Sequence, residues 1–327
     1  MTMETEDLQA TNELTEKVDF LRRNIQSMLI GQDDVIDQVL VALLCRGHVL
    51  LEGVPGLGKT LLVRALATCF DGQFRRIQFT PDLMPADMTG HSIYDMKEGR
   101  FHVRRGPVFT NLLLADEINR SPAKTQAALL EVMQEHQVTI EGTAYALAPP
   151  FMVLATQNPI EQEGTYPLPE AELDRFLMKV FIDYPAFEDE TRLVRQVTGG
   201  ELNMATLRER LSGTLAPEDV LELQRATERV TLDEQVLNYA VSLVQATRNA
   251  GSILKGAGPR ASIGLVSAAK AWALMNGRDF VLPDDIKQVA LPVMRHRILL
   301  APESEIEGFT PDRVLQQLLQ TVDAPRT

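Results

Sequence analysis

The stretch Gly53-Val54-Pro55-Gly56-Leu57-Gly58-Lys59-Thr60 fits the pattern G-x-x-x-x-G-K-[S/T]. It follows an apolar run, residues 48–52, that favours a short strand, and it precedes residues 61–67, which favour a helix because they contain no Gly or Pro. A strand, a glycine loop and a helix in this order form the context in which the motif binds nucleotide phosphates. An ordinary Gly/Pro turn is the alternative, and the flanking segments disfavour it.

Each residue type in the motif has a chemical reason to be there. The three glycines allow the backbone to curl so that its N–H groups face an anion, and the following helix directs its positive end to the same point. Lys59 supplies a mobile positive charge for the β- and γ-phosphates. Thr60 supplies a hydroxyl oxygen for Mg²⁺. The stretch therefore predicts a site for a nucleoside triphosphate with Mg²⁺.

A second landmark is the run Leu112-Leu113-Leu114-Ala115, which ends in Asp116 and Glu117. Its continuous apolar character predicts a strand buried on both faces, as in a parallel sheet. Ligands bind at the carboxyl ends of such strands, where these two acids lie. We expect Asp116 to hold Mg²⁺ and Glu117 to polarise the attacking water. Two solvated acids at a strand end are the alternative interpretation, which the P-loop disfavours.

Three further residues are candidates for the same chemistry. Asn158 follows the apolar run 151–156, where its amide could orient a water or contact the γ-phosphate, although Asn-Pro also forms simple turns. Arg175 precedes the predicted strand 177–182 and could pair with Asp174 or Glu172, or reach a neighbouring subunit's nucleotide as an arginine finger. Arg260 lies at a helix N-terminus, where a cation opposes the helix dipole, so we expect it to have a role beyond stability.

The order of patterns along the chain divides it into regions. We expect a polar tail at 1–13, an α/β nucleotide-binding core at 14–184, a linker helix at 185–200 and an α-helical domain without strands at 201–327. The core contains an insert at about 81–108, with a predicted hairpin around Glu98-Gly99. A second hairpin is predicted around Glu141-Gly142.

Composition limits the possible functions. The chain has 327 residues, with 32 Lys and Arg against 45 Asp and Glu, so its net charge of −13 disfavours non-specific nucleic-acid binding. Basic groups such as Arg75-Arg76 and Arg295-His296-Arg297 predict solvated faces or interfaces. The two cysteines, Cys45 and Cys69, lie in apolar runs typical of small buried side chains in a reducing compartment. With no signal sequence and no apolar run long enough to span a membrane, we expect a cytoplasmic protein.

Five segments together resemble the MoxR family of AAA+ ATPases. They occur in the family's order between about residues 20 and 300, and they are the P-loop, Ala115-Asp116-Glu117-Ile118-Asn119-Arg120, Ala155-Thr156-Gln157-Asn158-Pro159, Glu170-Ala171-Glu172-Leu173-Asp174-Arg175-Phe176 and Gly258-Pro259-Arg260-Ala261. The resemblance implies a P-loop αβα sandwich with a parallel five-stranded sheet, followed by an α-helical lid domain, with nucleotide between them.

The resemblance also implies roles for individual residues. Asn158 would be sensor 1, Arg175 the trans arginine finger and Arg260 sensor 2, and Ile30-Gly31 would contact adenine. Arg105 and Arg120 stay open as residues that share the finger role. The insert at about 81–108 resembles one that lines a ring pore.

The function implied is Mg²⁺-dependent ATP hydrolysis by a ring, hexameric by the same resemblance, that remodels or activates protein partners such as von Willebrand factor A domain proteins. An ATPase subunit of a metal chelatase-like complex is the alternative, and a nucleic-acid motor is disfavoured by charge.

Overall fold

The computed structural model describes residues 3–158, 164–199, 211 and 213–325, with side chains from residue 12 onward. Its central feature is a five-stranded sheet in the order β2-β5-β8-β1-β9, in which every neighbouring pair is parallel. The strands are β1 (Val49–Glu52), β2 (Phe74–Gln78), β5 (Leu112–Asp116), β8 (Met152–Gln157) and β9 (Met178–Phe181). The predicted parallel five-stranded sheet is therefore confirmed.

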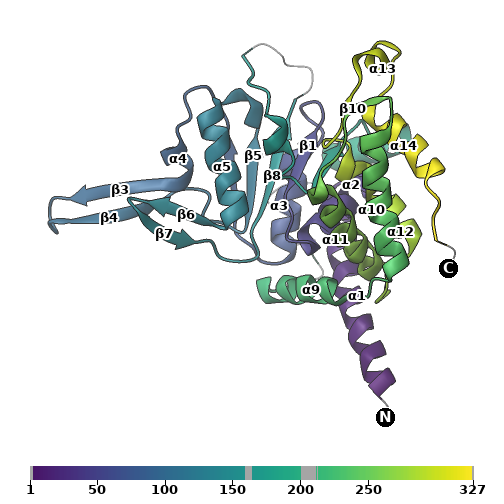
Figure 1. Cartoon of the computed structure of the whole chain (residues 1–327). Helices are drawn as coiled ribbons and strands as arrows, with labels where there is room; N and C mark the ends of the chain where they lie inside the picture. The colour runs from purple at the N-terminus through teal and green to yellow at the C-terminus, as the bar shows by residue number, and fades with distance from the viewer. Residues whose placement is uncertain (1–2, 159–163, 200–210, 212, 326–327) are drawn as a thin grey trace.

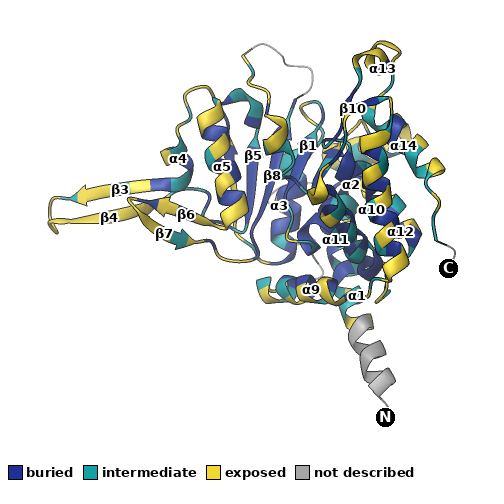
Figure 2. Ribbon diagram, in the orientation of Figure 1, coloured by how far each residue is buried: buried dark blue, intermediate teal, exposed yellow. Residues whose placement is uncertain are grey.

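The two faces of the sheet pack against different layers (Figures 1 and 2). Leu112 and Leu114 of β5 belong to a core shared with α1 (Met3–Met28), α2 (Asp33–Leu44) and α3 (Lys59–Cys69). Leu113, between them, belongs to the opposite core with α5 (Ala123–Glu135). Side chains of a strand alternate between its faces, so a strand that is apolar at every position is buried on both sides.

Helix α1 corrects one expectation, because the chain is helical from Met3 rather than a loose tail up to residue 13. The helix contacts α3 of the core and also α9 (Pro217–Arg229) and α11 (Pro259–Met275) of the helical domain. Lys17 Nζ lies 2.7 Å from Asp219 and 2.5 Å from Glu222 on α9. The N-terminal helix thus joins the core to the helical domain.

Two hairpins extend from the core, and both predicted hairpins are confirmed. In the insert, α4 (Pro85–Thr89) leads into β3 (Gly90–Asp95), which pairs antiparallel with β4 (Arg100–Arg105). This ribbon reaches far from the rest of the molecule (Figure 1), and all of β4 is exposed. The second hairpin joins β6 (Gln137–Ile140) to β7 (Thr143–Ala146).

After the short α6 (Glu170–Leu173) and the linker helix α7 (Phe187–Thr198), the C-terminal region is mainly helical, as predicted. Its elements are α9, α10 (Glu234–Asn249), α11, α12 (Pro283–Met294), α13 (Pro302–Ile306) and α14 (Pro311–Thr321). The expectation of no strand is wrong, because β10 (Ile253–Lys255) pairs antiparallel with β11 (Leu299–Leu300). Strands this short carry no recognisable alternation. The predicted boundary near residue 200 lies outside the described residues.

Candidate functional site

A cavity of about 420 Å³ lies where the P-loop meets the carboxyl ends of the parallel strands. Gly56 and Gly58 have φ values of +90° and +82°, a conformation that favours glycine, and Gly58 is the N-cap of α3. The cavity is large enough for part of a nucleotide. Its lining is Pro55, Gly56, Gly58, Lys59, Thr60, Leu61, Arg76, Asp116, Glu117, Thr156 and Asn158.

Lys59 reaches back across the loop, where its Nζ donates to the carbonyl of Gly53 and, at 3.5 Å, to that of Gln157. Burial lowers the pKa of Lys59, whereas the negative charges of Asp116 and Glu117 act in the opposite direction. The ammonium group therefore lies among carbonyls and carboxylates, where an incoming phosphate would replace weaker partners.

Asp116 is held at both carboxylate oxygens. Its Oδ1 accepts a hydrogen bond from Thr156 Oγ1 at 2.6 Å, and its Oδ2 accepts from Arg76 Nε at 3.0 Å and Nη2 at 2.6 Å. Thr60 lines the same cavity. A hydroxyl and a carboxylate are hard oxygen donors, so the two predicted ligands fit Mg²⁺, with Arg76 as the cation that already neutralises Asp116.

Glu117 has a strained backbone, with φ +56° and ψ +52°. This left-handed conformation costs a residue with a side chain about 1–2 kcal/mol. Its N–H donates to Thr156 Oγ1 at 2.8 Å, and its Oε2 accepts from Gln78 Nε2 at 2.7 Å and lies 3.1 Å from Arg120 Nε. The surroundings therefore hold this carboxylate at the cavity wall.

Three residues of this site, Arg76, Gln78 and Thr156, were not predicted from the sequence. Arg76 and Gln78 are two positions apart near the end of β2, so they project from the same face of the strand. The period-2 pattern of polar residues was a signal that could have identified them. Arg76 lies on an exposed face, as expected, and its guanidinium also contacts Asp116. Thr156 carried no signal, because its partners lie on a neighbouring strand.

Arg175 and Arg260 lie elsewhere, in a second cavity of about 280 Å³ that they line with His48 and Asp174. The two cavities have no lining residue in common. Val49 of β1 is paired with Met178 of β9, so Arg175 precedes the amino end of the sheet. The P-loop follows the carboxyl end of β1. The two ends of this four-residue strand are about 13 Å apart.

The two cavities differ in which domains line them. The lining of the P-loop cavity comes from the core alone, whereas Arg260 of the lid shares the second cavity with Arg175. Arg260 Nη1 lies 3.4 Å from Asp174 Oδ2, so Asp174 pairs with a lid arginine. Within one chain, the structure brings Lys59, Asp116 and Glu117 together and leaves both arginines apart from them.

The other predicted residues are outside the lining of the P-loop cavity. Ile30 and Gly31 form the turn between α1 and α2, and a Cβ built on Gly58 would lie 2.8 Å from Leu29 Cδ1 next to that turn. Of the open finger candidates, Arg120 pairs with Glu117, and Arg105 stacks 5.0 Å above the Phe109 ring. Pro159, which follows the predicted Asn158, lies outside the described residues.

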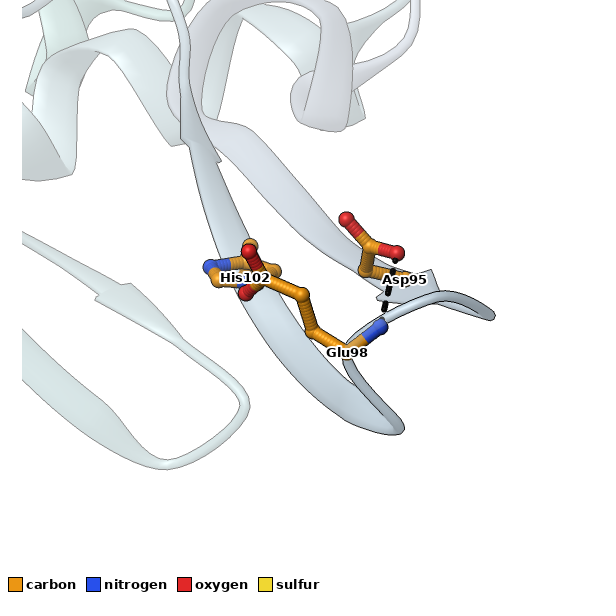
Figure 3. Close-up of side chains that lie close together, drawn as sticks. All are labelled: Asp95, Glu98 and His102. Atoms are coloured by element: carbon orange, nitrogen blue, oxygen red, sulfur yellow. Dashed lines mark hydrogen bonds and ion pairs between the residues drawn. The ribbon is translucent and has the colours of Figure 1, made fainter.

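A group of potential metal ligands, Asp95, Glu98 and His102, lies at the tip of the β3–β4 hairpin (Figure 3). Asp95 Oδ1 accepts from the backbone N–H groups of Lys97 and Glu98, and Glu98 Oε2 lies 2.6 Å from Arg100 and 2.8 Å from His102. These hydrogen bonds and ion pairs within the hairpin turn explain why the three side chains lie close together.

Comparison with known proteins agrees with this geometry. Residues 48–178 match the model of the ATPase family associated with various cellular activities (AAA), and residues 245–318 match the AAA lid domain. The chain is similar to an uncharacterised protein of Bacillus subtilis, 46% identical over 92% of this chain and 93% of that protein. It is 43% identical to chaperone MoxR1 of Mycobacterium tuberculosis, over 92% of this chain and 81% of that protein.

A solved structure shows the same arrangement over almost the whole chain. The crystal structure of a protein described as a candidate ATPase from Cytophaga hutchinsonii has a TM-score of 0.91 and 44% identity, and the match covers 99% of this chain and 100% of that one. Among the described residues, no helix has the length and apolar character that crossing a membrane requires.

Proposed function

Because this chain belongs to the MoxR family of AAA+ ATPases, and is therefore an ATPase, we propose that it works as a Mg²⁺-dependent ring whose ATP hydrolysis remodels or activates protein partners. The ring is hexameric in this proposal. The observation that carries it is the separation of Arg175 and Arg260 from the P-loop of their own chain.

One half of the site comes from the P-loop cavity. The loop's backbone N–H groups and Lys59 bind the phosphates, and Ile30-Gly31 contacts the adenine. Thr60 and Asp116 would hold Mg²⁺, which, when bound, offsets phosphate charge. Glu117 accepts a proton from the attacking water, and Asn158, buried at the cavity wall, orients that water. These roles are supported by the shared cavity of Lys59, Thr60, Asp116, Glu117 and Asn158.

The other half of the site comes from a neighbouring subunit. An arginine at the amino end of the sheet is on the wrong side of its own chain to neutralise charge at the P-loop, but a head-to-tail neighbour can present it there. Arg260 lines the same cavity as Arg175 and pairs with the neighbouring Asp174. Both arginines therefore act in trans in this proposal. Such an interface closes into a ring when the rotation between subunits allows it.

The client is proposed to be a protein, for instance a von Willebrand factor A domain protein. The relative from M. tuberculosis is named a chaperone, and the family resemblance supports such a role here. A net charge of −13 argues against a nucleic-acid client. A cytoplasmic location belongs to the same proposal and is supported by the unpaired Cys45 and Cys69.

Mixing two inactive variants tests the trans site. Arg175→Ala keeps the P-loop half, and Glu117→Gln keeps the arginine half, so each alone should lose at least about 100-fold in ATPase rate. Mixed one to one before ATP is added, they should regain activity, because about one quarter of head-to-tail junctions then combine two intact halves.

Wild-type activity per subunit should also rise with protein concentration. Arg313→Ala, on the exposed surface of α14, is the control variant and should leave the rate unchanged. A rate per subunit that does not depend on concentration, together with no recovery in the mixture, would refute the trans site.

A further inference from the structure

Arg297 is a buried arginine between the lid and the segment that carries Arg175. It follows α12, and only 3% of its side chain is exposed. Nε donates to Asp174 Oδ1 at 2.8 Å, Nη1 to the carbonyls of Leu177 at 3.0 Å and Val293, and Nη2 to the carbonyls of Phe176 at 2.6 Å and Asp174 at 3.3 Å. These five hydrogen bonds equal the number of N–H groups on a guanidinium.

The arrangement is more specific than lid packing requires. The basic group 295–297 was expected to be solvated or at an interface, and burying a cation is costly unless it is paired. Four of the five acceptors belong to residues 174–177, on both sides of Arg175 in sequence. The adjacent His296 adds a contact of 3.0 Å from its Nε2 to the carbonyl of Phe176. The lid thus holds the backbone of the segment that carries the finger.

Asp174 extends this contact to the second arginine of the cavity. Its Oδ1 accepts from Arg297 and its Oδ2 lies 3.4 Å from Arg260 Nη1. One carboxylate therefore links a buried lid arginine to an exposed one. Arg175 belongs to the core and Arg260 to the lid, and Asp174 and Arg297 connect the segments that carry them.

We propose that Arg297 is a positioning residue for the trans site, which fixes Arg175 and Arg260 as one unit through Asp174 and the carbonyls of residues 174–177. This inference rests on the proposed function. Arg297 contacts no substrate, because it is buried behind the segment that it orients. Its effect is on the neighbour's nucleotide and not on that of its own chain.

The test uses Arg297→Lys, which keeps the charge but cannot form the planar fork of hydrogen bonds. We expect its affinity for a fluorescent ATP analogue to stay within about twofold of wild type, while kcat falls about 100-fold, as a misplacement of about 1 Å would produce. Mixing with Glu117→Gln should restore activity, because that subunit supplies an intact arginine half. Mixing with Arg175→Ala should not, because both variants lack the same half.

Arg278→Lys is the matched control. Arg278 also forms a close pair with a buried lid carboxylate, Asp285, at 2.6 and 2.7 Å, but it does not line the second cavity. We expect Arg278→Lys to lower the unfolding temperature and to leave kcat of the assembled protein within about twofold of wild type. Equal losses of kcat in both lysine variants would show that Arg297 is only a structural residue of the lid.

A second variant covers the case in which Arg297→Lys does not fold. Asp174→Asn keeps the shape of a side chain that is 31% exposed and removes the charge shared by Arg260 and Arg297. It should show the same recovery with Glu117→Gln and none with Arg175→Ala. An unchanged kcat in a folded Asp174→Asn or Arg297→Lys overturns the inference. Failure of the Arg175→Ala and Glu117→Gln mixture would instead refute the proposed trans site itself.

Discussion

The buried side chain of His48 makes the stability of this protein dependent on pH. His48 immediately precedes β1, and its Nδ1 accepts from the Val153 N–H at 2.9 Å while its Nε2 lies 3.0 Å from the carbonyl of Met133. The neutral ring with its proton on Nε2 satisfies both partners. Protonation of Nδ1 would direct an N–H group at another N–H group in a buried place. Burial, the largest cause, lowers the pKa of His48 to about 4.

The sign and size of the effect follow from this shift. The folded-state pKa lies below the ordinary value of 6.5, so between these two values the unfolded chain binds more protons, and the free energy of unfolding falls as the pH falls. For one such group, about 2 kcal/mol is lost between about pH 7.5 and pH 5.0. Most of that window lies above the titration of ordinary carboxylates, so they contribute little.

Urea unfolding followed by circular dichroism at about pH 7.5 and pH 5.0 measures this loss. We expect His48→Gln to be less stable than wild type at neutral pH, because a glutamine cannot reach both partners as the ring does. Its stability should depend less on pH, by about 2 kcal/mol across the window.

His91→Gln, an exposed histidine on β3, removes a histidine without removing these contacts and serves as the control. If His48→Gln and wild type lose the same free energy between the two pH values, the assignment to His48 is refuted.

Two further predictions concern the P-loop cavity. Arg76→Gln removes the guanidinium that lies 2.6 Å from Asp116 Oδ2, and because this half-exposed pair is worth up to about 1 kcal/mol, the Mg²⁺ concentration for half-maximal ATPase activity should fall by up to about fivefold. An increased Mg²⁺ requirement would contradict that competition. Gly53→Ala places a Cβ 2.4 Å from the carbonyl oxygen of Ile182, so the loop must shift, and nucleotide affinity measured with a fluorescent analogue should fall at least about tenfold. Unchanged affinity would mean that the loop tolerates the displacement.

Most of the core could be predicted because its signals are local. The apolar runs of β5 and β8 are buried on both faces, and the turns at Gly99 and Gly142, where φ is +65° and +77°, connect the two hairpins as expected. Gly56, Gly58, Lys59 and Asp116 line one cavity because the P-loop follows β1 and Asp116 ends β5, and parallel strands end at the same edge. Local sequence and this one rule of topology are enough for half of the site.

The other features depend on contacts between distant residues. Helix α1 begins at Met3, and the β10–β11 pair joins strands of only three and two residues that lie far apart in sequence. Gln78 and Thr156 became part of the site only through neighbouring strands. The periodicity of a single segment does not show which distant residues will pair.

The sequence by itself determined the sheet and the nucleotide chemistry, and it singled out Arg175 and Arg260 as unusual residues. These features follow from hydrogen bonding and apolar periodicity, which act over a few residues. Only the tertiary structure decided that Arg260 of the lid lies in the same cavity as Arg175, and that Arg297 is buried against the segment of Arg175. The physical reason is that burial and side-chain pairing depend on which elements pack together, and the packing of the lid against β9 and α2 joins residues more than 100 positions apart, such as Arg297 and Asp174.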